Sequence, residues 1–129
     1  MSHEAEIGGR GWVAVVLWLA VQLTLTSLPG KVIPVNLHHP LDWFGHFGLY
    51  AGIGVLVARV GMLRRWPARR LLVAGLILSA WAALDELHQL LIPGRDAELG
   101  DWASDTLGGA LGLYVGMRLM SSRFARWLQ

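Results

Sequence analysis

The hydrophobic residues form long runs without acidic or basic residues, whereas a soluble domain would show short periodic stripes. These runs cover residues 11–30, 43–58, 71–84 and 106–117. The first run alone is long enough to cross the roughly 30 Å hydrocarbon layer as a helix. The third and fourth reach that length only if their helices include acidic residues. The pattern predicts one all-α membrane domain over residues 1–129, a bundle of four transmembrane helices at about 11–29, 42–60, 70–92 and 101–120.

Composition agrees with this prediction. Of the 129 residues, 54% are hydrophobic and only 16% charged, and the mean hydropathy is +0.47. A soluble helical bundle is the alternative, but the apolar runs are too long for it. The seven tryptophans, several near run ends, are typical of membrane interfaces. Without cysteine there is neither disulfide nor thiol chemistry, and no basic stripe with interleaved aromatics indicates nucleic-acid binding.

The basic residues predict the orientation. Five arginines lie between the second and third helices, Arg10 precedes the first, and the tail follows the fourth with three more: Arg118, Arg123 and Arg126. In a four-span protein these regions share one side, and basic loops stay cytoplasmic. Both termini are therefore predicted to be cytoplasmic. A cleaved signal sequence is the alternative for the first run, but "LTLTSLPGK" lacks a small-x-small cleavage site.

The acidic residues collect at the opposite, outer side, where the fixed cations are only Lys31 and Arg95. Acids in an outer loop need no special explanation. Acids within helices do, because an ionisable group near the bilayer centre costs about 2.5–3.5 kcal/mol and normally turns inward to find partners. The seven outer acids are Asp42, Asp85, Glu86, Asp96, Glu98, Asp101 and Asp105.

Spacing places several polar residues on common helical faces. Asp42, His46 and Tyr50 follow at i, i+4 and i+8, which is one face of a helix. Asp85 with Gln89, and Asp101 with Asp105, repeat the i, i+4 spacing. We expect a polar cavity open to the outer side, with Arg95 across its mouth. The predicted lining is Asp42, His46, Tyr50, Asp85, Glu86, Gln89, Asp101 and Asp105.

Internal pairing is the structural alternative, with Arg95 bound to Asp101 or Glu86 and His46 bound to Asp85. However, the acids outnumber the cations, so some carboxylates would need a proton, a metal ion or a cationic ligand. His88 and the loop pair His38–His39 are weaker candidates and are left out of the predicted site.

Glycines at four-residue spacing predict close helix packing. Gly108, Gly112 and Gly116 lie in the fourth helix, and Gly48 and Gly52 in the second. Packing within the chain is the simpler interpretation, and a homodimer through Gly108, Gly112 and Gly116 is the other.

The segments "DWFGHFGLY" and "LDELHQLLIPGRDAELGDWASDTLGGALG" resemble the VanZ-like family of small bacterial membrane proteins. The resemblance covers most of residues 41–112. It differs at Trp43, where the family often has Lys, and at Asp105, where it usually has Asn. The resemblance implies a multi-pass protein of the bacterial inner membrane, linked to resistance to the lipid-tailed glycopeptide teicoplanin, and supplies no reaction.

Three functions follow as hypotheses. The first is binding or modification of a lipid-linked cell-wall precursor, another membrane lipid or a glycopeptide at the acidic site, with Arg95 on a phosphate or carboxylate. The second is an intramembrane lipid-phosphate hydrolase or transferase using Mg²⁺ or Mn²⁺. Its metal candidates are Asp42, His46, Asp85, Glu86 and Asp101, and its catalytic candidates are His46, Asp85, Glu86 and Arg95. The third is proton-coupled lipid transport.

Overall fold

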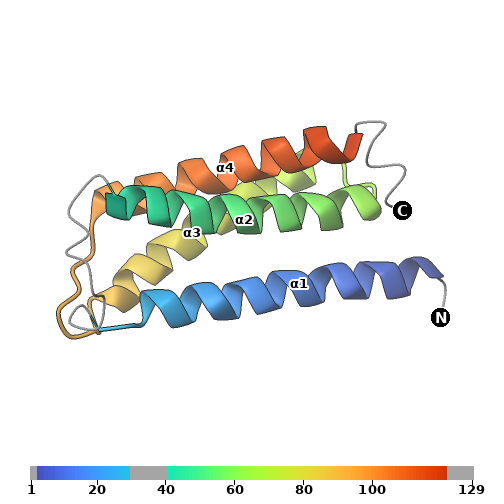
Figure 1. Cartoon of the computed structure of the whole chain (residues 1–129). Coiled ribbons are helices and arrows are strands. Elements are labelled where there is room, and N and C mark those ends of the chain that lie inside the picture. The colour runs from blue at the N-terminus through green and yellow to red at the C-terminus, as the bar shows by residue number, and fades with distance from the viewer. Residues whose placement is uncertain (1–2, 30–40, 122–129) are drawn as a thin grey trace.

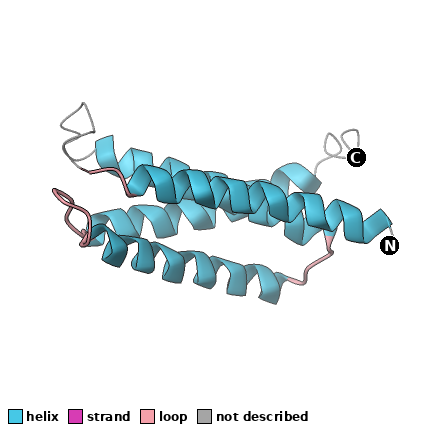
Figure 2. Cartoon of the chain, turned by 90° about the horizontal axis from the view of Figure 1, so that it is seen from below, coloured by secondary structure: helices cyan, strands magenta, loops and turns pink. Residues whose placement is uncertain are grey.

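The computed structural model describes residues 3–29 and 41–121. Lys31 and the pair His38–His39 lie outside these ranges. Within them the chain forms four α-helices: α1 (His3–Thr26), α2 (Leu41–Leu63), α3 (Ala68–Gln89) and α4 (Leu99–Ser121). The α2–α3 and α3–α4 connections lie at opposite ends of the bundle (Figure 2). The prediction of an all-helical chain with four helices is confirmed.

Three of the helices have the length and apolar composition of membrane spans: Gly9–Thr26 of α1, all of α2 and all of α3. Many of their large apolar side chains point outward, as lipid-facing residues do; Leu17, Phe44 and Ile77 are each more than 60% exposed. Helix α4 is as long as α2. It is not among the described helices whose length and composition qualify them as candidate spans.

The helix ends differ from the predicted limits by up to eight residues. Helix α1 begins at His3, not near residue 11, because the loss of apolar residues marks the edge of a membrane segment and does not by itself end a helix. Helix α3 ends at Gln89, not at residue 92. A proline disfavours helical geometry in the residue before it, and Pro93 is followed by Gly94 at a φ of 77°, so the chain turns there.

Helices α2 and α4 form the most extensive contact in the molecule and run side by side in the same direction (Figure 1). Glycine makes this approach possible: a Cβ added at Gly108 would overlap the carbonyl of Phe47, and one at Gly112 would overlap that of Ala51. Gly116 packs on Val55 and Ala58 in the same way. The glycine face is therefore occupied by α2 of the same chain, which explains the spacing without a second copy.

Helices α3 and α1 complete the bundle. Helix α3 crosses behind the α2–α4 pair (Figure 1) and contributes Leu78 and Ala82 to the core. Helix α1 packs mainly on α2, where the indole of Trp18 fills the space over Gly52 and donates a 2.8 Å hydrogen bond to the carbonyl of Leu49. The start of α2, the end of α3 and the start of α4 consequently meet at one end of the bundle (Figure 1).

Candidate functional site

A buried polar cluster lies at the end of the bundle where α2 and α4 begin. The imidazole of His46 is at its centre and is only 5% exposed. Its Nδ1 lies 3.1 Å from Oδ1 of Asp105. Its Nε2 lies 3.8 Å from Oδ2 of Asp101 and 4.0 Å from Oδ1 of Asp42. One histidine is thus surrounded by carboxylates from α2 and α4.

The spacing on each helix explains how these groups meet. Asp42 stands one turn before His46 on α2, and Asp101 one turn before Asp105 on α4. Since the two helices start at the same end and run in parallel, the faces match turn for turn. Asp101 and Asp105 are buried, while the Asp42 side chain keeps 28% of its surface exposed. Asp42 therefore connects the cluster to the outside of the bundle.

Helix α3 closes the cluster with Glu86, whose Oε1 lies 4.0 Å from Nδ1 of His46. Both Glu86 oxygens are held: Oε1 accepts a 3.1 Å hydrogen bond from the Gln89 amide, and Oε2 accepts one of 2.9 Å from the backbone N–H of Glu98. Arg95 donates to Oε1 of Gln89 through Nε and Nη2, at 3.2 and 2.8 Å. Through these hydrogen bonds Glu86 and Gln89 hold the connection between α3 and α4 in place.

These contacts differ from the internal pairings of Arg95 and His46 that were the alternative to a ligand-binding site. Arg95 is bound to the amide of Gln89 and not to Asp101 or Glu86. Asp105 makes the shortest contact to His46, whereas Asp85 accepts a 2.9 Å hydrogen bond from Thr26 of α1. Asp85 therefore belongs to a second polar group beside the histidine cluster, on the side of the bundle that α1 covers.

Two residues of this second group were missed by the sequence reasoning. Gln22 and Thr26 are buried at 1% and 3% exposure, although both lie in the uncharged run of α1. Their i, i+4 spacing was the available signal, because it places both polar side chains on one helical face. The hydroxyl of Tyr50 is buried as well and lies within electrostatic reach of Asp85 and Asp105.

Several buried polar atoms of these two groups make no hydrogen bond within residues 3–29 and 41–121. They are the Tyr50 hydroxyl, both amide atoms of Gln22, Oδ2 of Asp85 and Oδ2 of Asp105. Native proteins leave few buried polar atoms unsatisfied, and each such atom calls for an explanation such as bound water or an ion. Their concentration here indicates a place that receives a ligand or ordered water.

Among residues 3–29 and 41–121, two sets of side chains have the ligand types and spacing to hold a metal ion. One is Asp42, His46 and Asp101, and the other is His46, Glu86 and Asp105; within each set the ligand atoms lie within 4.8 Å of one another. Asp85, also a predicted metal candidate, is in neither set. Carboxylate oxygens and an imidazole nitrogen are suitable donors for divalent cations.

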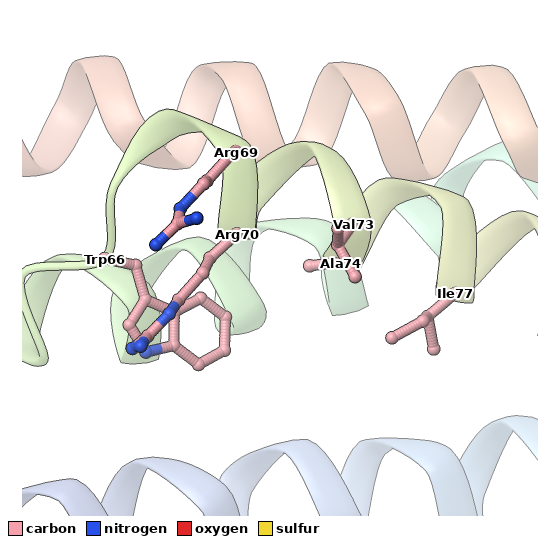
Figure 3. Close-up of a pocket in the computed structure, with 6 residues that line it drawn as sticks. All are labelled: Trp66, Arg69, Arg70, Val73, Ala74 and Ile77. Carbon is pink, nitrogen blue, oxygen red and sulfur yellow. The ribbon is translucent and has the colours of Figure 1, made fainter.

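A separate cavity of about 370 Å³ lies at the opposite end, along the start of α3 (Figure 3). The exposed side chains of Arg69 and Arg70 lie over one part of it, and Val73, Ala74 and Ile77 continue it with apolar surface. Trp66 completes the lining and packs on Trp12 of α1, with 6.2 Å between ring centroids. None of the predicted site residues borders this cavity.

The fold and the long apolar helices define an all-helical membrane protein with a buried acidic cluster at one end of its bundle. The chain belongs to the VanZ/LLP1 family, which matches residues 12–120. The VanZ-like assignment predicted from the sequence is thereby confirmed. Searches of curated proteins and of solved structures gave no match.

Proposed function

We propose that this VanZ-like protein crosses the bacterial inner membrane four times with both termini in the cytoplasm. In this proposal the three apolar helices are three of the spans and α4 is the fourth. Helix α4 lies against α2 through glycine contacts along much of its length. A helix held beside a membrane span in this way shares its depth. The arginines of the α2–α3 connection and Arg118 lie at one end, and the acidic cluster at the other, which supports an outward-facing cluster.

We further propose that the cluster binds or modifies the polar head group of a lipid-linked envelope component, or a glycopeptide, and thereby contributes to teicoplanin resistance. The observation that carries this proposal is the enclosure of His46 by Asp42, Asp101 and Asp105 inside an apolar bundle. Such groups are costly in a membrane and usually mark a functional site. The exposed edge of Asp42 supplies the access.

Binding can be tested with the purified protein in lipid nanodiscs. We expect saturable binding of teicoplanin or of a lipid-linked precursor that falls at least about tenfold in Asp101→Asn. Asp96→Asn is the matched control, because Asp96 is an exposed outer acid that changes in the same way. Expression of the same variants in a susceptible host should lower teicoplanin resistance in the same order. Equal binding and equal resistance for wild type and Asp101→Asn would refute the assignment.

Orientation has its own test, because the chain contains no cysteine. A single cysteine at position 96 should react with a membrane-impermeant maleimide in intact cells, whereas one at position 64 should react only after permeabilisation. The reverse pattern would invert the proposed orientation.

The second candidate function is a metal-dependent lipid-phosphate hydrolase or transferase. It is favoured by the two sets of potential metal ligands that share His46. Release of phosphate from a lipid phosphate with Mg²⁺ or Mn²⁺, absent in Asp101→Asn, would establish this function; binding without turnover would exclude it for the substrates tried. Transport gains no such support, because the described residues buried in the other half of the bundle are apolar or glycine.

A further inference from the structure

The cavity at the basic end of the bundle changes from charged to apolar along its length. Its lining residues form two rows on one side of α3, each at four-residue spacing (Figure 3). One row is Trp66, Arg70 and Ala74, and the other is Arg69, Val73 and Ile77. At a rise of 1.5 Å per residue, Ile77 lies about 12 Å beyond Arg69 along the helix. The guanidinium groups and the aliphatic side chains therefore occupy different depths of one cavity.

The basic end of the cavity is bounded by Trp66, which the turn after α2 holds in place. Arg65 takes a φ of 51°, its N–H donates to the carbonyl of Met62 at 3.1 Å, and the N–H of Trp66 donates to that of Gly61 at 2.8 Å. This is the Schellman arrangement, which gives the chain a defined direction after a helix. The indole packs over Gly61 and against Trp12 of α1. This boundary is formed by the chain itself and requires no occupant.

The charge at this end is positive. Among the described residues, the lining contains two guanidinium groups and no carboxylate. Helix α3 has no side-chain cap and no acidic residue in its first turn, so the positive end of its dipole adds to the two arginines. Guanidinium groups bind phosphate through paired hydrogen bonds. A phosphate group is therefore the ligand that suits the basic end.

The apolar part of the cavity lies within a candidate membrane span. Helix α3 qualifies as a span from Ala68 onward, so Arg69 stands at the edge of the membrane and Ile77 lies deeper. Val73 and Ile77 are 52% and 63% exposed, which leaves this part open to the hydrocarbon. A phospholipid has the same order of groups, with a phosphate at the interface and an acyl chain below it. The two parts of the cavity therefore match one lipid molecule better than a free anion.

We propose that this cavity binds one anionic glycerophospholipid of the phosphatidylglycerol class. Arg69 and Arg70 hold its phosphate, Trp66 packs beside the glycerol, and one acyl chain lies on the aliphatic residues of the cavity. A zwitterionic head group would place its ammonium beside two guanidinium groups. In the orientation proposed above this is the cytoplasmic leaflet, whose anionic lipids attract basic segments. The site lies at the opposite end from the acidic cluster, so it goes beyond the proposed function.

The test titrates delipidated full-length protein in detergent with phosphatidylglycerol and counts bound lipid by native mass spectrometry. We expect one retained phosphatidylglycerol per chain, with phosphatidylcholine of the same acyl chains binding at least about tenfold more weakly. The cavity variant, Arg69→Gln with Arg70→Gln, should lose at least about tenfold in affinity. The charge control, Arg59→Gln with Arg64→Gln, removes two exposed arginines that do not line the cavity. It should stay within about threefold of wild type, because salt screens charges outside the site.

The acyl part of the site has its own pair of variants. Ile77→Trp places a large ring where the acyl chain lies and should lower the affinity for phosphatidylglycerol at least about fivefold, since both need the same volume. Leu76→Trp is the matched control, because Leu76 and Ile77 are each 63% exposed but Leu76 does not line the cavity. Glycerol 3-phosphate, which has the phosphate and no acyl chain, should not displace phosphatidylglycerol at equal concentration.

Equal affinity for the cavity variant and wild type, or an equal loss in the charge control, would overturn the proposal, because binding would then follow the charge of the whole end. Displacement by glycerol 3-phosphate, or unchanged binding in Ile77→Trp, would leave a phosphate site without a lipid and equally overturn it. A dimer that forms in place of lipid binding and is lost in Ile77→Trp would assign the cavity to a second copy of the chain.

Discussion

The two ends of the bundle differ in whether their charged residues are buried or exposed. At the end where α2 and α4 begin, Asp85, Glu86, Asp101 and Asp105 are buried between helices. At the other end the arginines of the α2–α3 connection are exposed, and the cavity beside α3 is bordered by Arg69 and Arg70. Exposed arginines can orient a protein in a membrane with little demand on its interior. Buried acids need partners, so the acidic end must be built with greater precision than the basic end.

The largest effect is expected at the glycine contacts between α2 and α4, which align the acidic faces of the two helices. Gly112→Ala puts a Cβ against the carbonyl of Ala51, which no side-chain movement relieves. We expect a loss of about 3 kcal/mol or more in the free energy of unfolding, at the upper end for overpacking. Gly48→Ala is the matched control on α2, because a Cβ there meets nothing within 4 Å. Unfolding in detergent measures both, and equal stabilities would contradict the packing described.

A smaller effect is expected where α1 meets the acidic end. Thr26→Val removes the hydrogen bond to Asp85 and leaves a buried carboxylate without that donor. The expected cost is about 1–3 kcal/mol, the penalty of an unsatisfied buried group. Thr24→Val on the same helix should cost much less, since the exposed Thr24 bonds only to the backbone of Ala20. The same unfolding assay compares them, and a larger loss for Thr24→Val would reverse the assignment.

The smallest effect is expected when one arginine is replaced by glutamine at each end of the bundle. Arg95→Gln removes two contacts to Gln89 and should lower the free energy of unfolding by about 1 kcal/mol. Arg69→Gln, at an exposed residue, should stay within about 0.5 kcal/mol of wild type. Indistinguishable values would mean that Arg95 contributes no more to stability than an exposed arginine does.

The sequence predicted the helices because uncharged runs of this length have few other uses. It predicted the helix ends less well, since polarity marks the membrane edge and helices continue beyond it, as α1 does at His3. Helical spacing was enough to predict that His46 and the acids share inward faces.

The pairing of those groups could not be predicted from spacing. Whether His46 meets Asp85 or Asp105 depends on the register between helices, which long-range packing determines. Gln22 and Thr26 were overlooked for a related reason: isolated polar residues in an apolar run gain meaning only when their neighbours on another helix are known.

The glycine contacts between α2 and α4 fix the register of the two helices as well as allowing them to pack closely. Phe47 lies on Gly108, Ala51 on Gly112 and Val55 on Gly116, each pair four residues from the last. Sliding one helix by a single turn, about 5.4 Å, would restore glycine-to-helix contact but bring His46 opposite Gly109 or Asp101 in place of Asp105. The glycine contact furthest from the acids, at Gly116, therefore helps to determine which groups surround His46, although it lies outside the acidic cluster.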